Sequence, residues 1–252
     1  MKELQRTEIP LWQERTALLL GADKLKKLAE SRVLLVGAGG VGGHAAEALV
    51  RAGVGRLTLA DFDTVHLTNC NRQLAALHST AGRSKIEVLK ERFLDINPAL
   101  ELELRDMMVT DANAAELLAG PWDLLLDAID MVSGKCALLA EAWRRHIPTV
   151  SAMGAGGKMD PAQIRVADLG KTFQCPLARQ VRGNLRKRGV TGGILAVFSA
   201  EATPETAVRP PDRDAGETRS TVGTISYMPA IFGLHLAAAG IGLLLEKMAE
   251  NQ

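Results

Sequence analysis

A glycine-rich turn followed by an acidic residue is the part of this sequence best suited to chemistry. The turn contains Gly37, Gly39, Gly40 and Gly42, and Asp61 follows about 20 residues later. Glycines let the backbone approach a phosphate, and free N–H groups at a helix N-terminus favour its charge. A carboxylate at this spacing is typical of sites that hold ribose hydroxyls. The glycines alone also fit a tight strand-to-helix turn, but together the features predict a nucleotide site.

The segment that follows Asp61 narrows the kind of nucleotide. It reads DFDTVHLTNCNRQ from Asp61 to Gln73, with several amides and one arginine. A hydride-transfer enzyme needs an apolar slot for a nicotinamide ring, which this segment does not offer. Arg72 is a permanent cation whose fork of donors suits phosphate oxygens. The segment therefore favours a site for a phosphate-rich nucleotide over a dehydrogenase.

Apolar periodicity predicts the elements that position these residues. Val33–Val36 is typical of a buried strand, His44–Ala52 of a helix with one apolar face, and Leu57–Ala60 of a second strand that ends at Asp61. Before them, residues 1–31 predict a helical lead-in whose leucines cover the sheet. The later elements are a helix to Ile96 opened by Gly82–Lys85, a strand at Leu100–Leu104, a short helix at Asp111–Leu118, a strand at Leu124–Leu126, a helix at Lys135–Arg145 and a strand at Pro148–Ala152.

This alternation predicts an α/β fold with a doubly wound, mostly parallel, Rossmann-like sheet, followed by C-terminal strands and helices. Ligands of such sheets bind at the carboxyl ends of the strands. Asp127 and Asp130 follow the strand at Leu124–Leu126, so we expect them at this edge, although Asp127 also suits a helix cap. Lys85, at a helix start, is a flexible point charge able to reach a phosphate.

The amino-acid composition limits the class of protein and the cellular compartment that we expect. The 252 residues are 47% hydrophobic and 23% charged, as in a globular protein with a sizeable core. A net charge of +1 means that any nucleic-acid surface must be a local patch. Met1–Arg6 has no apolar signal core, so we expect a cytoplasmic protein. The three cysteines, Cys70, Cys136 and Cys175, have no CxxC spacing, which argues against a zinc clip or disulfide framework.

A basic run marks the C-terminal part of the chain. No acidic residue lies between Lys171 and Arg188, and Pro176 suits a helix start. A solvated helix face is the alternative explanation, but the lack of acidic partners favours contact with a polyanion. The predicted RNA-binding residues are Lys171, Arg179, Arg182, Arg186, Lys187 and Arg188.

Other C-terminal segments have weaker signals. Gly154–Gly157 predicts a turn between strands, with Lys158 a candidate for the acceptor side of the site and Gln163–Ala167 as the next strand. Ser199–Ser220 predicts a mobile loop. Pro229–Leu245 is almost wholly apolar but short and rich in small residues, which favours a buried or dimer-interface helix over a membrane anchor.

The order and spacing of the motifs resemble those of the ubiquitin-activating-enzyme-like superfamily, whose members use ATP to adenylate a carboxylate. The shared motifs are Gly-x-Gly-Gly-x-Gly, a strand, Asp-x-Asp-x-Val and Asn-x-Asn-Arg-Gln. The resemblance implies that Arg72, Lys85 and Asp130 are catalytic, with Mg²⁺ held by Asp130 through ATP. Arg15 is similar to an arginine that reaches the phosphates, often across a dimer interface. The implied ATP ligands are Gly37, Gly39, Gly40, Gly42, Asp61, Asp63, Asn69, Asn71, Arg72, Gln73, Lys85 and Asp130.

Within that superfamily, the chain resembles the branch of tRNA threonylcarbamoyladenosine dehydratases. Motifs at Asp127–Asp130, Gly154–Gly157, Lys171–Thr172, Pro176–Ala178 and Val197–Ser199 support this. The implied activity is ATP-dependent dehydration and cyclisation of N6-threonylcarbamoyladenosine in tRNA through carboxylate adenylation. A homodimer and a sulfur-relay partner protein are further implications. One domain, 1–252, is expected, with a nucleotide-binding core at 1–152 and a tRNA-binding and dimerisation part at 153–252.

Three other activities compete with this one. An adenylyltransferase that activates the C-terminal glycine of a small sulfur-carrier protein is the main alternative, but that group typically carries CxxC pairs. The polar segment around Arg72 argues against an oxidoreductase. The set of phosphate ligands argues against a non-catalytic nucleotide-binding adaptor. Some relatives place a cysteine where this chain has Ser220–Thr224, so we expect no covalent cysteine intermediate.

Overall fold

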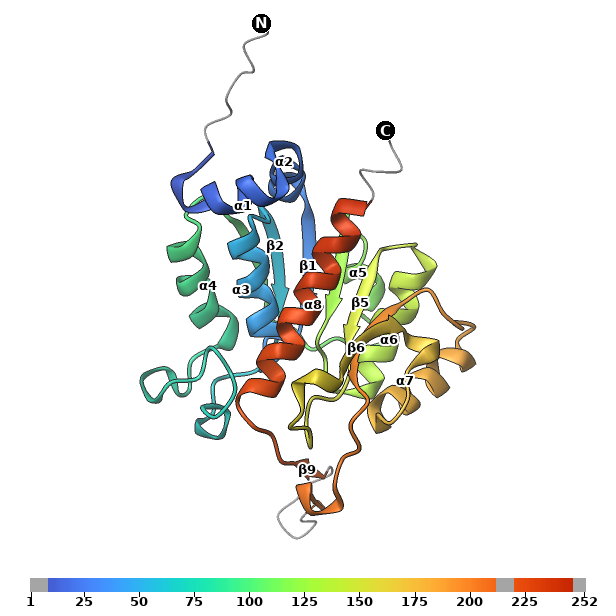
Figure 1. Cartoon of the computed structure of the whole chain (residues 1–252). Coiled ribbons are helices and arrows are strands. Elements are labelled where there is room, and N and C mark those ends of the chain that lie inside the picture. Colours follow the sequence, from blue (N-terminus) through green and yellow to red (C-terminus); the bar gives the residue numbers. More distant parts are fainter. Residues whose placement is uncertain (1–8, 212–219, 247–252) are drawn as a thin grey trace, which may run out of the picture.

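The computed structural model describes residues 9–211 and 220–246. Seven strands form one sheet in the order β3-β2-β1-β4-β5-β7-β6 (Figure 1). Every neighbouring pair is parallel except β6 and β7, which confirms the predicted fold class. The strands are β1 (Arg32–Val36), β2 (Arg56–Ala60), β3 (Glu101–Arg105), β4 (Leu124–Asp127), β5 (Thr149–Ala152), β6 (Ile164–Asp168) and β7 (Leu195–Ser199).

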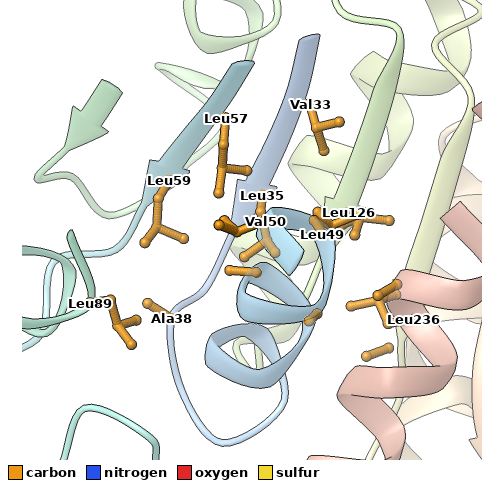
Figure 2. Close-up of a cluster of buried hydrophobic side chains, with 14 of the residues drawn as sticks. Val33, Leu35, Ala38, Leu49, Val50, Leu57, Leu59, Leu89, Leu126 and Leu236 are labelled. Atoms are coloured by element: carbon orange, nitrogen blue, oxygen red, sulfur yellow. The ribbon is translucent and has the colours of Figure 1, made fainter. Parts of the chain in front are cut away.

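Helices cover both faces of the sheet because the central strands are apolar on both sides. Successive strand side chains point to opposite faces. Leu35 therefore packs under α3, α4 and α8 on one face (Figure 2), whereas Leu34 packs under α5 and α6 on the other. The helices are α1 (Glu14–Leu20), α2 (Ala22–Glu30), α3 (Gly42–Ala52), α4 (Lys85–Ile96), α5 (Ala114–Leu117), α6 (Val132–Arg144), α7 (Pro176–Lys187) and α8 (Tyr227–Glu246).

The apolar C-terminal helix is a core element. α8 lies beside α3 and over β4 and β5, with Phe232 and Leu236 completely buried. In the described part of the chain, α8 is the one helix whose length and composition would allow it to cross a membrane. Its packing against the sheet instead fits the predicted buried helix, although Leu234 on its outer face is 52% exposed.

Two predictions for segments outside the sheet are wrong in part. The leucines before β1 are predicted to cover the sheet, yet Leu11, Leu18 and Leu19 are 91%, 82% and 83% exposed. The 3-10 turn Leu11–Gln13 presents the first of them outward, and α1 presents the other two. The predicted loop Ser199–Ser220 contains a short strand, β8 (Val208–Arg209), which pairs with β9 (Thr221–Val222). Residues 212–219 of that loop lie outside the described residues.

Candidate functional site

The glycine turn leads from β1 into α3 and forms the floor of a cavity of about 400 Å³. Gly37 has φ of 95°, a left-handed conformation that favours glycine. Gly39 and Gly40 also line this nucleotide cavity, whereas Gly42 does not. A Cβ at Gly42 would lie 1.7 Å from the Gly37 carbonyl oxygen. Gly42 is thus required for close packing of α3 against the turn and is not shown to contact a ligand.

The carboxylate at the end of β2 faces the same cavity. Asp61 Oδ2 accepts a hydrogen bond from the Ala38 N–H at 2.6 Å, and Oδ1 accepts one from the Asp63 N–H at 2.8 Å. Burial raises the pKa of Asp61 above its usual value, although these hydrogen bonds oppose the shift. The two bonds fix the carboxylate beside the glycine turn, at the position expected for a ribose-binding group.

Lys85 is held more firmly than the sequence predicts. It begins α4 and is 4% exposed, and its Nζ lies 2.6 Å from Asp63 Oδ2. The prediction of a flexible point charge is therefore wrong, because burial and the ion pair fix the side chain. Both Lys85 and Asp63 line the nucleotide cavity, so the ammonium still lies where a phosphate would bind.

Arg72 and Gln73 bring further polar groups to this cavity. Arg72 Nη1 donates to the Thr68 carbonyl oxygen at 3.0 Å and to Asn71 Oδ1 at 2.8 Å, which orients the guanidinium. Gln73 Oε1 is a buried side-chain oxygen that has no hydrogen-bond partner among the described residues. A buried acceptor without a donor needs an explanation, and a donor from a bound nucleotide would supply it.

The two asparagines predicted to bind ATP do not line the cavity. Asn69 Oδ1 accepts a hydrogen bond from the His66 N–H at 3.0 Å, and Asn71 Nδ2 donates to the Thr224 carbonyl oxygen at 3.0 Å. The Asn69 amide holds its own segment, because short polar side chains readily bond to nearby backbone. The Asn71 amide instead ties this segment to the backbone before α8. Asn71 also supports the Arg72 guanidinium, and neither asparagine lines the cavity.

Asp130 lies on a turn after β4 and lines the cavity, as predicted. A fully buried ion pair fixes this turn: Lys135 Nζ lies 2.6 Å from Asp127 Oδ2. Asp127 Oδ1 also accepts from the Ile129 N–H at 3.0 Å, and Lys135 donates to the Ile129 carbonyl oxygen at 2.8 Å. Asp127 is therefore no helix cap, since Met131 precedes α6 and Asp127 instead pairs with Lys135.

Sequence reasoning missed the apolar wall of the cavity. Phe62 and the segment Met107–Val109 line the cavity, together with Met131. Such a wall suits a flat base, because ligand sites combine apolar surface with few polar groups. Met107–Val109 comes just after β3, as Asp61 does after β2. The sequence signal for this wall was its place directly after a predicted parallel strand, where ligands of such sheets bind.

The structure does not bring Arg15 to the site of its own chain. It lies exposed on α1, which connects through α2 to the start of β1. The glycine turn follows the opposite end of β1, and Figure 1 shows α1 at the other end of the sheet. A contact with ATP within one chain is therefore excluded by this fold, and only another copy could bring Arg15 to the phosphates.

The basic run forms α7 and its flanks, as predicted. Val181 and Leu185 are buried against α6 and β7, which turns the polar face outward. Two of the predicted RNA-binding residues nevertheless bond to other residues of the protein. Arg182 donates to the Thr172 carbonyl oxygen at 2.8 Å, and Arg188 pairs with Asp111. The expectation of no acidic partner is wrong for Arg188, because folding brings Asp111 to it.

Four basic residues of this segment stay exposed and have no side-chain partner among the described residues. They are Lys171, Arg179, Arg186 and Lys187.

The sequence profile of the ThiF family matches residues 13–252. The chain belongs to the ThiF family. This membership confirms the resemblance to ubiquitin-activating-enzyme-like proteins. The Bacillus subtilis tRNA threonylcarbamoyladenosine dehydratase is 43% identical over 188 residues, which cover 75% of this chain and 74% of that protein. The Escherichia coli protein of the same name is 44% identical over 201 residues, covering 76% and 75%.

A solved structure also matches nearly the whole chain. The E. coli dehydratase in complex with ATP superposes with a TM-score of 0.88 and 37% identity, over 97% of this chain and 99% of that one. The seven-stranded sheet and the helices that cover it are thus shared with a family member that binds ATP.

Proposed function

We propose that this ThiF-family protein is an ATP-dependent tRNA threonylcarbamoyladenosine dehydratase. The observation that carries the proposal is the match over 97% of the chain to a dehydratase solved with ATP. The nucleotide cavity supports it, because a glycine turn, a fixed carboxylate and two cations converge there. ATP is the cofactor that this set of groups fits.

The first step is adenylation. A carboxylate oxygen of the threonylcarbamoyl group attacks the α-phosphorus of ATP, the bond from that phosphorus to the bridging oxygen breaks, and pyrophosphate leaves. Arg72 and Lys85 line the cavity as fixed cations, so they stabilise the charge that develops on the phosphates. Asp61 positions the ribose, which holds the α-phosphorus in line with the acceptor.

The second step is ring closure. A nitrogen or oxygen of the same modification attacks the acyl carbon and loses its proton, and AMP leaves with one of the original carboxylate oxygens. The nucleoside is then lighter by one water. Because this attack is intramolecular, orientation supplies much of the rate and a protein nucleophile is not required.

Magnesium fits the residues at the phosphate end of the cavity. The Asp130 carboxylate is exposed to the cavity and has no hydrogen-bond or ion-pair partner among the described residues. Mg²⁺ is typically bound by one or two carboxylates plus phosphate oxygens, which this site and ATP would supply together. We assign Asp130 as the residue that holds the ion through ATP, where it would neutralise phosphate charge.

We also assign tRNA contact to the exposed cations of α7.

We further infer a homodimer whose interface contains the exposed leucines of the N-terminal segment. Leu11, Leu18 and Leu19 form an apolar surface next to Arg15 on the same N-terminal segment. A second copy on that surface would exclude it from water and bring Arg15 towards the partner's phosphates. Mixing Arg15→Ala with Asp130→Asn tests this: shared sites would restore activity, and independent sites would stay inactive. The sulfur-relay partner remains a prediction.

ATP–pyrophosphate exchange tests the proposed function. We expect exchange with tRNA that carries threonylcarbamoyladenosine and background exchange with the same tRNA lacking it, since only the former has the carboxylate. Asp130→Asn should abolish the exchange. Exchange driven by a small sulfur-carrier protein and not by modified tRNA would favour the alternative adenylyltransferase.

A further inference from the structure

A second cavity of about 910 Å³ lies next to the nucleotide cavity. Arg72, Asp130 and Gly156 line both, so the two spaces meet beside the groups assigned to the triphosphate. The second cavity then extends away from the glycine turn to Lys158 and Gln180. This is the acceptor cavity, because a group placed in it reaches the phosphates from the side opposite the base.

The acceptor cavity is bounded by the helix that carries the exposed cations. Pro176, Leu177 and Gln180 of α7 form part of its wall. Arg179, on the same helix, is exposed to solvent. A polyanion bound along the outside of α7 would therefore lie beside the cavity and could insert one nucleoside, while its backbone remained on the surface.

Lys158 is the buried cation of this cavity. It follows the glycines at 154–157 and is 2% exposed. Its Nζ donates to the Glu201 carbonyl oxygen, and it has no ion-pair partner among the described residues. An ammonium has three donors, and burying one with a single hydrogen-bond partner is costly. Burial lowers the pKa of Lys158 below its usual value, although the nearby Glu201 charge favours the ammonium. A second, anionic partner would offset that cost.

The backbone around Lys158 is held in place from outside the turn. Glu201 Oε2 accepts from the N–H groups of Met159 and Asp160, each at 2.9 Å. The Tyr227 hydroxyl donates to the Met159 carbonyl oxygen at 2.8 Å. These bonds fix the backbone beside Lys158, and the bond to the Glu201 carbonyl oxygen fixes its ammonium before any ligand arrives, as a binding group needs to be.

We propose that Lys158 binds the carboxylate of the threonylcarbamoyl group in the acceptor cavity. This inference rests on the proposed dehydratase function. A carboxylate that approaches a triphosphate is repelled by like charge. A fixed cation on the acceptor side counters that repulsion and aims the carboxylate at the α-phosphorus. Lys158 thus selects the modified nucleoside over unmodified adenosine, in addition to any contact that tRNA makes with α7.

The test compares the affinities for two tRNAs, identical except that one lacks the threonylcarbamoyl group, with α,β-methylene ATP bound. We expect the wild-type protein to bind the modified tRNA about tenfold more tightly or more, as for a hydrogen bond between charged groups. Lys158→Met should reduce that ratio to about one. Its affinities for ATP and for unmodified tRNA should not change. Lys26→Met, an exposed lysine on α2, is the matched control and should keep the wild-type ratio.

An unchanged ratio in Lys158→Met, or no preference in the wild-type protein, would overturn the assignment. Lys158→Gln keeps a donor for the Glu201 carbonyl oxygen without the charge, so it replaces the first variant if that one fails to fold. A merely structural role would weaken binding of both tRNAs equally. Failure of the proposed function can be told apart from failure of the Lys158 assignment. In that case the wild-type protein would form no dehydrated nucleoside, whichever tRNA it binds more tightly.

Discussion

Lys135 Nζ lies 2.6 Å from Asp127 Oδ2, and both side chains are completely buried behind the turn that carries Asp130. Ser151 Oγ donates to the same carboxylate oxygen at 2.6 Å. This pair joins β4, β5 and α6 at the point where the sheet meets the phosphate site. It provides rigid support for the loop carboxylate to which we assign the metal ion.

Breaking this pair from one side should destabilise the protein strongly. Lys135→Met leaves the Asp127 carboxylate buried without its cation, which we expect to cost about 3–5 kcal/mol in the free energy of unfolding. Urea denaturation measures this change. The double variant Asp127→Leu/Lys135→Met removes both charges and should lose less. A loss of about 1 kcal/mol or less in the single variant would contradict the structural role of the pair.

The raised pKa of Asp61 predicts a pH dependence of ATP affinity. The ionised carboxylate accepts hydrogen bonds through both oxygens, whereas protonation turns one oxygen into a donor and weakens the group as an acceptor. Burial raises the pKa, so ATP affinity should fall on acidification at a higher pH than an ordinary aspartate would cause. Affinity is thus retained above the raised pKa and lost below it. Asp61→Asn should bind more weakly and lack this step, and an unchanged pH profile in that variant would exclude Asp61 as its source.

The salt dependence of tRNA binding should separate the exposed cations of α7 from those bonded to other described residues. Arg179→Ala/Arg186→Ala should weaken binding and reduce the slope of log affinity against log salt by about 0.7–0.9 for each phosphate that is no longer neutralised. Arg182→Ala should change that slope less, because Arg182 is bonded to Thr172. Lys24→Ala/Lys26→Ala on α2 is the control. Equal slopes in all variants would indicate that α7 is a solvated helix face that does not contact tRNA.

Removing the cysteines should leave dehydration largely intact. Cys136 is buried behind α7, and burial raises its thiol pKa, which disfavours the nucleophilic thiolate. Cys175 is the informative case, because it is buried yet lines the acceptor cavity, a placement that the sequence did not reveal. Cys70→Ala, Cys136→Ala and Cys175→Ala should each retain turnover. A thioester trapped on Cys175 with modified tRNA would show that ring closure uses a covalent route.

The sequence predicted those parts of the site that depend on local rules. A buried strand, a glycine turn and a helix determined the positions of Gly37 and Asp61, because each follows from apolar periodicity and the geometry of parallel strands. The ends of β1 and β2 were therefore placed correctly, and the end of β4 was placed within one residue. The order of the motifs identified the family.

Features that depend on contacts between distant segments could not be predicted in this way. The pairing of Arg188 with Asp111 and the burial of Lys158 under Glu201 join residues far apart in the chain. The asparagines of the ATP motif were assigned by type, yet their short side chains bond to the backbone in this structure. The exposure of Leu18 and Leu19 follows from how α1 packs, which periodicity alone does not determine.

The most direct test of the central claim is mass spectrometry of nucleosides from modified tRNA incubated with the protein, ATP and Mg²⁺. We predict that threonylcarbamoyladenosine is replaced by a nucleoside lighter by one water, with one AMP and one pyrophosphate formed for each conversion. Asp130→Asn should leave the nucleoside unchanged. An unaltered nucleoside with the wild-type protein, while ATP is bound and the tRNA is fully modified, would contradict the assignment as a dehydratase.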